Sequence, residues 1–381
     1  MPPHAKSDWD PLDLSILGNQ RRAYDEMRET CPVAHSDFLG WSLFRHRDVA
    51  GATADSMTFS NVSKHRAVPN GMDPPEHTRY RQAINPFFVP ARMTAFEPET
   101  RRLAGRLVES MLARTTFDFV SDFSGPFCSR SLCDFLGWPE DTWVPILEWT
   151  HGNQEAALSR DREAGAALAR ELADIVLEQV NARRDAGRSV ASDLTTSLME
   201  IEVDGRALSN EELVSVLRNW IAGHGTVAAA LEILMFHIAS DQKLQAKLRS
   251  DPTLVPAAVD EIMRLDGPLV ANARTTTSDV LIGGRNIPAG DRVTLIWIAA
   301  NRDPHVFDDP DRIHLDRDQS QNLVFGAGIH DCVGASLARL ELKVALEEIL
   351  SRTASIERSG ATPKRALYPS NGFVELGLRF C

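Results

Sequence analysis

The stretch that decides the fold is FGAGIHDCVG, residues 325–334, and it leads directly into the helix-forming run ASLARLELK. It carries one cysteine, Cys332, from a glycine-rich loop to the expected start of a helix. Backbone N–H groups and the helix dipole favour a thiolate at such a position. The glycines of the stretch remove side chains on both sides of the sulfur, so a large, flat molecule could approach it. Taken alone, Cys332 would equally fit a buried structural cysteine beside a tight turn.

A second informative stretch, AGHGT at residues 222–226, lies in the middle of a long expected helix. That helix is predicted from Asn210 to Ser240, with acids in its first turn, and would span about 45 Å. Gly223 and Gly225 each cost roughly 1 kcal/mol relative to alanine inside a helix. Two such residues in one turn call for a packing or functional reason.

The remaining chain predicts a fold that is mainly α with a minor β region. Apolar residues at three- and four-residue spacing predict helices, and short runs bounded by turn residues predict strands. The expected helices lie at 95–113, 164–180, 256–265 and 332–351, and the expected strands at 33–44, 201–208 and 274–298. No repeat or low-complexity linker divides the chain, and no flavin or iron–sulfur segment is recognisable. We therefore expect a single domain over 1–381 without a fused reductase.

Composition indicates a soluble globular protein, with 43% apolar and 25% charged residues. The formal net charge of −12 argues against nucleic acid as a partner. The five cysteines include no Cys-x-x-Cys pair, which favours a reduced compartment. No signal peptide is visible, and the uncharged run 219–231 is too short to span a bilayer. We expect a cytoplasmic protein without membrane contact.

The cysteine stretch resembles the haem-binding loop of the cytochrome P450 family, in the pattern Phe-x-x-Gly-x-His-x-Cys-x-Gly. In that family the cysteine is the axial thiolate ligand of the haem iron. The resemblance implies haem b as cofactor, Cys332 as the metal ligand, and Phe325 and Gly334 in the haem pocket. It also implies the cytochrome P450 fold, a triangular prism with the haem between the long central helix and the helix that follows the cysteine.

Three further residues resemble a structural lock of the same family. Glu261 and Arg264 match its Glu-x-x-Arg pair, and Arg317 lies in the Asp/Pro-rich segment that matches the family's meander. An exposed ion pair of neighbouring helix residues is the ordinary alternative for Glu261 and Arg264. The resemblance implies a structural role for the three residues.

Four cationic or imidazole side chains match the family's partners for the two haem propionates, which need positive donors when partly buried. They are His77, Arg81, Arg274 and His330. His77 and Arg81 are spaced i, i+4, so they would point the same way from one helix. A solvated surface charge is the alternative for each of them alone.

The AGHGT stretch resembles the family's oxygen-binding groove, so Gly223, His224, Gly225 and Thr226 are the candidate catalytic residues. The resemblance implies that Gly223 lets the helix pass close to the haem and that Thr226 supplies a hydroxyl to the distal oxygen. Gly225 occupies the position of the family's usual carboxylate, so its proton relay is incomplete. His224 is titratable but lies about 100° away around the helix. Water, a polar group of the substrate, or a preference for peroxide would each answer this gap.

The resemblance implies a haem-dependent monooxygenase that inserts one atom of O2 into a small, largely hydrophobic organic substrate. Electrons would come from a separate ferredoxin or flavodoxin with its reductase, and the protein would be a monomer. Arg79, Arg339 and Lys343 flank the haem motifs and are candidates for a docking face. A peroxide-driven oxidase or peroxygenase, a non-catalytic haem sensor and a cysteine hydrolase built on Cys332 are the alternatives.

Substrate contacts follow from the resemblance as a set of small or apolar positions with two amides. The residues expected to line the pocket are Asn219, Ala222, Leu269, Val270 and Asn371. Apolar core packing is the alternative for most of them. Asn219 or Asn371 would supply one polar handle for the substrate.

Overall fold

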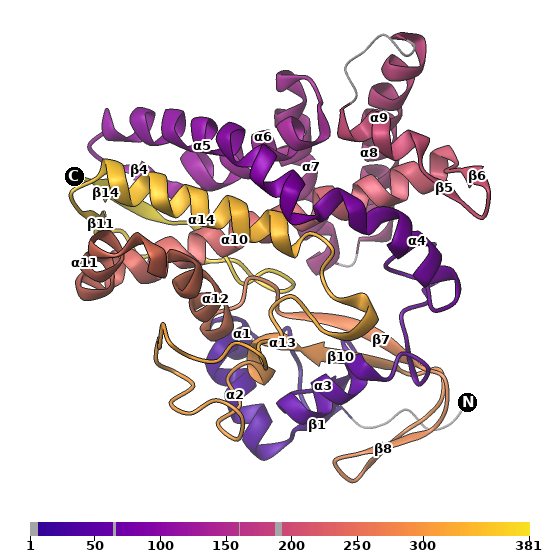
Figure 1. The fold of residues 1–381 in the computed structure, drawn as a ribbon. Helices are drawn as coiled ribbons and strands as arrows, with labels where there is room; N and C mark the ends of the chain where they lie inside the picture. Colours follow the sequence, from indigo (N-terminus) through magenta and orange to yellow (C-terminus); the bar gives the residue numbers. More distant parts are fainter. Residues whose placement is uncertain (1–6, 64–65, 160, 187–192) are drawn as a thin grey trace.

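The computed structural model describes residues 7–63, 66–159, 161–186 and 193–381, and helices dominate it (Figure 1). The helices are α1 Leu14–Leu17, α2 Gln20–Thr30, α3 His46–Ala54, α4 Glu76–Ile84, α5 Pro90–Leu112, α6 Gly125–Leu136, α7 Trp143–Ser159, α8 Arg162–Ala186, α9 Leu194–Glu200, α10 Asn210–Ser240, α11 Gln242–Ser250, α12 Val255–Leu265, α13 Trp297–Ala300 and α14 Ala335–Arg352. The strands are β1 Val33–Ser36, β2 Gly40–Leu43, β3 Phe59–Ser60, β4 Phe117–Asp118, β5 Glu202–Val203, β6 Arg206–Ala207, β7 Ala271–Thr276, β8 Val280–Ile282, β9 Arg285–Ile287, β10 Arg292–Ile296, β11 Ile356–Arg358, β12 Lys364–Arg365, β13 Phe373–Glu375 and β14 Gly377–Phe380. The prediction of a mainly α fold with a minor β region is confirmed.

The central helix α10 organises the helical part of the molecule. It begins with a capping box, in which the Ser209 hydroxyl accepts from the N–H of Glu212 and the Glu212 carboxylate accepts from the N–H of Ser209. By length and composition alone α10 could cross a membrane, but 61% of its apolar window is buried inside the protein. The apolar residues of α10 therefore pack in the hydrophobic core of the protein.

The helices α6, α7, α8, α12 and α14 pack against α10, and α5 packs against α14 and α6; they share one large hydrophobic core. Figure 1 shows α5 and α14 running side by side across the molecule. Fully buried leucines from three of these helices, Leu132, Leu231 and Leu346, belong to this core. Such burial contributes about 1.5–3 kcal/mol per side chain, so the position of α10 is fixed from several sides.

The main sheet has five strands in the order β1-β2-β10-β7-β3 and lies beyond the helical part. Strand β10 pairs parallel with β2 and antiparallel with β7, which places Arg274 opposite Val293. The expected strand region 274–298 ends earlier than predicted, because Ile296 pairs with the first residue of β7 and the chain then turns into α13. The predicted hairpin at 201–208 is present as β5 and β6.

The carboxylate of Glu261 is the common acceptor in the structural lock predicted from the sequence. Arg264, Arg317, Gln319 and the backbone N–H of His314 all donate to it, at 2.8–3.0 Å. Burial alone would raise the pKa of Glu261, but these donors, Arg264 first, hold it below its ordinary value. The side chains of Glu261 and Arg264 have no exposed surface, so the alternative of a solvated pair is wrong.

The arginine of this lock also fixes the long loop that follows α13. Arg264 donates to the carbonyl oxygens of Asn301 and Pro310, at 2.9 and 3.0 Å, and its guanidinium lies 5.1 Å from the ring of Phe307. These contacts satisfy carbonyls in a segment without helix or strand. One buried ion pair thus shapes the chain on the way to the cysteine loop.

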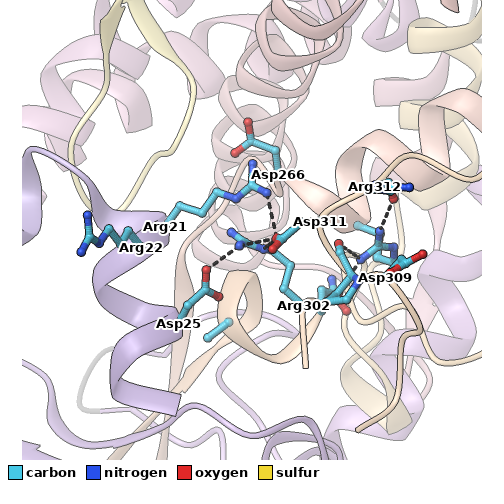
Figure 2. A network of polar contacts seen from close by, with 12 residues as sticks. Arg21, Arg22, Asp25, Asp266, Arg302, Asp309, Asp311 and Arg312 are labelled. Carbon is cyan, nitrogen blue, oxygen red and sulfur yellow. Dashed lines mark hydrogen bonds and ion pairs between the residues drawn. The ribbon is translucent and has the colours of Figure 1, made fainter. Parts of the chain in front are cut away.

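A second polar network ties the same loop to the N-terminal helix α2 (Figure 2). Arg302 pairs with Asp25 of α2 and, at 2.6 Å, with Asp311. Arg21 of α2 also reaches Asp311, at 3.1 Å. The Arg302 side chain is almost fully buried, so its two acids are needed to compensate its charge.

We predict that Arg264→Leu lowers the free energy of unfolding by about 3–5 kcal/mol, because it leaves Glu261 buried without its main counter-charge. Urea denaturation followed by circular dichroism would measure the loss. Arg102→Leu is the matched control, since Arg102 pairs at the same i, i+3 spacing with Glu99 on an exposed surface. Equal midpoints for the two variants would contradict the role of the lock.

Candidate active site

The cysteine loop is closed by backbone hydrogen bonds. The N–H of Cys332 donates to the carbonyl of Phe325 at 2.8 Å, and the N–H of Ala335 donates to the carbonyl of Cys332 at 3.3 Å. Gly328 has a φ of +71°, and a Cβ there would lie 2.5 Å from the carbonyl oxygen of Thr53. The helix begins at Ala335, three residues later than predicted, because its first hydrogen bond, from the N–H of Ala338, is accepted by the carbonyl of Gly334.

The Cys332 thiol is free and its residue is exposed, although the loop lies against the helical core. Burial among protein atoms raises the pKa of this thiol, and the N–H of Gly334 and the charge of Arg81 oppose the rise. A bound metal cation would displace the proton and stabilise the thiolate. No group of three or more His, Cys, Asp or Glu suited to a metal exists among the described residues. A cysteine thiolate is one of the protein ligands that hold the iron of a haem.

Open glycine surfaces leave room for such a flat group. Gly223 is exposed at the middle of α10, between turns that are largely buried, and a Cβ on it would meet nothing within 4 Å. A Cβ on Gly334 would meet only the ring of Phe88, at 4.0 Å. Protein interiors are normally close-packed. The open space therefore fits the requirement of the haem that these residues were predicted to contact.

Of the four predicted propionate partners, His77 and Arg274 are buried and His330 is half-buried. Both ring nitrogens of His77 and the Nε2 of His330 have no hydrogen-bond partner in the described part of the chain, and the two rings lie 4.3 Å apart. Arg274 is buried on β7 and donates to the carbonyl of Ala273. Burial and the neighbouring His77 and Arg274 lower the pKa of His330 to about 3, and burial lowers that of Arg274 to about 10. The two propionate carboxylates of a haem would accept hydrogen bonds from these side chains and compensate their positive charge.

The fourth predicted partner, Arg81, is bound to the cysteine loop. Its guanidinium donates to the carbonyl and the carboxylate of Asp331, at 2.7 and 2.6 Å, and so joins α4 to the loop. No role was predicted for Asp331 or for Asp73. The Asp73 carboxylate lies 4.0 Å from His330 and accepts from the hydroxyl of Ser60.

The side chain of His224 points away from the open space beside Gly223. Its Nδ1 contacts the carbonyl of Trp220 at 3.1 Å, and its Nε2 contacts the Glu341 carboxylate of α14 at 3.3 Å. Burial alone would lower the pKa of His224, but the Glu341 charge raises it above the ordinary value. Ser131 donates to the same Glu341 oxygen at 2.6 Å. His224 thus joins α10 to α14 and α6.

Gly225 faces the helix α7. A Cβ on Gly225 would lie 2.6 Å from Cγ2 of Thr150 and 3.3 Å from Nε2 of Gln154. The Thr150 hydroxyl donates to the carbonyl of Ile146 within α7, so it is the methyl group that approaches α10. The space of the missing side chain is therefore taken by a neighbouring helix. Thr226, the next residue, is half-buried.

The predicted substrate contacts fall into two groups. The NH2 group of Asn219 donates to the carbonyl of Val68 at 2.9 Å, and that of Asn371 donates to Asp266 and Gly267 at 2.8 and 2.9 Å. Ala222 and Leu269 are half-buried, whereas Val270 is fully buried in a separate core cluster with residues of the N-terminal region. The structure thus gives packing or tethering contacts to Asn219, Asn371 and Val270.

The proposed docking residues are all paired with acids on the surface, and these pairs reduce the local positive charge. Arg79 pairs with Asp204, Arg339 with Asp260, and Lys343 with Glu97 and Glu347. A separate open depression of about 690 Å³ lies between the β1–β2 turn and the α7–α8 junction. None of its lining residues belongs to α10 or to the cysteine loop.

The free thiol, the open glycine surfaces and the unused donors together define the site of a haem-thiolate protein. The family model "Cytochrome P450" matches residues 144–374, and the chain belongs to the cytochrome P450 family. The chain is 33% identical to cyclomarin C epoxidase of Salinispora arenicola, over 88% of this chain and 89% of that one. It is also 33% identical to erythromycin C-12 hydroxylase of Saccharopolyspora erythraea, over 86% and 85% of the two chains.

Solved structures agree with this assignment. A mutant of P450 EryK in complex with erythromycin B superposes with a TM-score of 0.87, at 28% identity, over 95% of this chain and 96% of that one. CYP109E1 from Bacillus megaterium in complex with testosterone gives a TM-score of 0.84, at 27% identity, over 95% and 99%. The predicted cytochrome P450 fold and the haem cofactor are confirmed, and the protein is a P450 monooxygenase.

We predict that the effect of Gly225→Ala on stability reverses sign when Thr150 is first changed to serine. Alanine gains about 1 kcal/mol of helix propensity, but its Cβ would clash with the Thr150 methyl at a cost of roughly 1–3 kcal/mol. Thr150→Ser removes that methyl and keeps the hydroxyl that bonds to Ile146. A double-mutant cycle of unfolding free energies measures the coupling. Additive effects would show that the two helices do not touch at Gly225.

We predict that His224 makes stability fall as the pH rises. Its pKa is raised in the folded state, so the stabilisation is complete below the unfolded value of about 6.5. It is lost as the pH rises through the folded-state pKa. The free energy of unfolding should be measured against pH for the wild type and His224→Gln, which cannot titrate. A difference between the two proteins that does not decline with rising pH would refute the ion pair with Glu341.

Proposed function

We propose that the protein inserts one atom of O2 into a largely hydrophobic organic substrate, with haem held by Cys332. The observation that carries this proposal is the free, accessible Cys332 thiol beside open glycine surfaces and unused donors. The relatives that are named as an epoxidase and a hydroxylase support an oxygen-inserting reaction. A hydroxylation or a related oxidation is the reaction class we assign.

Several residues of the chain would each have a distinct role around the haem. The haem, when bound, would supply the activation of O2. Cys332 would hold the iron, and His77, Arg81, Arg274 and His330 would hold the propionates. The ring nitrogens of His77 and the Nε2 of His330 have no hydrogen-bond partner among the described residues. Arg81 would fix the cysteine loop through Asp331. Phe325 and Gly334 would line the haem, Phe325 with its face against the guanidinium of Arg339 at 4.3 Å.

Proton delivery would depend on Thr226 and water. The Thr226 hydroxyl would hold and orient water beside the haem site, and Gly223 leaves open space there. His224 does not supply the missing acid, because both of its ring nitrogens are engaged by Trp220 and Glu341. A water chain is therefore the route that we assign in place of a carboxylate at position 225.

Substrate recognition would be mainly apolar. The NH2 groups of Asn219 and Asn371, the expected polar handles, are engaged by the chain itself. The relatives and neighbours are named for different compounds, among them cyclomarin C, erythromycin and testosterone. Family membership therefore does not single out one substrate, and the small substrate expected from the sequence remains a prediction.

We further propose a monomeric, cytoplasmic single-domain enzyme over residues 1–381 that receives electrons from a separate ferredoxin or flavodoxin and its reductase. The five cysteines, all free, support a reduced compartment. The acid-paired state of Arg79, Arg339 and Lys343 gives a basic docking face little support. Backbone and apolar contacts around the cysteine loop are the remaining basis for partner docking.

We predict that the holoprotein, reduced under carbon monoxide, shows the long-wavelength Soret band of thiolate ligation, and that Cys332→Ser abolishes it. With a surrogate ferredoxin, its reductase and a panel of hydrophobic compounds, product should carry one atom of 18O from 18O2. Mass spectrometry reads the label. Label from peroxide but none from O2 would favour the peroxide-driven alternative, and no product from either oxidant would favour the haem sensor.

A further inference from the structure

The gap at Gly225 has a polar neighbour on another helix. The amide nitrogen of Gln154 lies 3.3 Å from the point where a Cβ on Gly225 would be, so it lies beside the position of the missing acid side chain. Gln154 is half-buried, and its side chain has no hydrogen-bond partner among the residues that the structure describes. Half-buried amides normally find partners in the protein or in ordered water.

The helix α7 holds Gln154 at this place. The Trp149 indole donates to the carbonyl of Leu168 on α8 at 2.9 Å, and Ile146 and Trp149 are buried. Thr150 and Gln154 are spaced i, i+4, so they share the face of α7 that meets α10. Thr150 takes the near part of the gap with its methyl group, which leaves Gln154 as the polar group at its edge.

The other groups near Gly225 are committed elsewhere. The ring of His224 is held by Trp220 and Glu341. The hydroxyl of Thr150 is held by Ile146. Gln154 is thus the group beside Gly225 with free donors, next in space to the helix turn that carries Thr226.

We propose that Gln154 is a positioning residue of the oxygen groove, where its amide orders the water that serves Thr226 in place of the missing carboxylate. The inference rests on the proposed monooxygenase function. The amide transfers no proton itself; it donates a hydrogen bond to water, and that water passes a proton on and regains one from the solvent. The absence of an acid at position 225 is thereby offset by a neutral side chain on α7.

The test uses the holoprotein and three variants. Gln154→Leu removes the amide at nearly the same size, Gln154→Glu restores a hydrogen-bonding group, and Glu155→Leu makes the matched change at the next, exposed position of α7. The first measurement needs no substrate: the infrared C–O stretching band of carbon monoxide on the reduced protein, which reports polar groups near the distal site. The second is NADPH consumption with a surrogate ferredoxin and reductase, in H2O and in D2O.

Gln154→Leu should shift the C–O band, slow NADPH consumption by roughly tenfold, the factor of one lost hydrogen bond, and enlarge the solvent isotope effect. Gln154→Glu should recover the rate and add a pH-dependent band position, and Glu155→Leu should behave as the wild type. A C–O band and isotope effect unchanged in Gln154→Leu would overturn the proposal. A change confined to the substrate-induced spin shift would also overturn it, because Gln154 would then be a substrate contact.

The result is separable from the proposed function. If the wild type lacks the thiolate-type Soret band under carbon monoxide, the haem-thiolate function itself fails. If the wild type shows that band and all three variants keep it with full haem content, misfolding is excluded. If Gln154→Leu then changes neither the C–O band nor the isotope effect, the result contradicts the positioning role of Gln154 and leaves the haem-thiolate function unaffected.

Discussion

The buried Glu261 carboxylate is the constraint on which the rest of the structure depends. A charge without solvent must be compensated nearby, and Glu261 collects donors from its own helix, from Arg317, and from the loop that leads to the cysteine. Because Arg264 also binds carbonyls of that loop, the pair determines where an otherwise irregular segment runs. The cysteine loop begins where this fixed segment ends. The Glu261–Arg264 ion pair therefore helps to position the Cys332 thiol, although the pair takes no part in the chemistry.

Different sides of the central helix α10 carry structural contacts and the residues proposed for the chemistry. One side carries His224, which is held in an ion pair with Glu341 of α14. Another side exposes Gly223 to open space, and Gly225 admits the methyl group of Thr150. Glycines that weaken an isolated helix are tolerated here because tertiary packing supplies most of a buried helix's stability. The weak point of the helix is therefore also the point where a large ligand and a neighbouring helix approach its backbone.

Much of the site could be predicted from the sequence because its residues lie in short, contiguous stretches. Cys332 with its loop and the Glu261–Arg264 pair could be assigned by their resemblance to short family motifs, and the expected helices by local spacing. Other contacts could not be predicted, because they join distant segments: His224 and Glu341 are separated by 117 residues, and Arg81 and Asp331 by 250. The helix after the cysteine began later than expected, since its first hydrogen bond is accepted by the carbonyl of Gly334, a pairing that the sequence does not show.

The sequence by itself determined the family, the mainly α architecture, the thiol that would hold iron, and the absence of an acid at position 225, because each depends on which residue stands at a local position. The tertiary structure decided what surrounds those residues. It engaged His224 with Glu341, turned the amides of Asn219 and Asn371 back onto the chain, and set Thr150 and Gln154 of α7 against Gly225. The physical reason is that a buried polar group or an empty space is satisfied by whichever helix packs against it, and helix packing joins segments that are far apart in the chain.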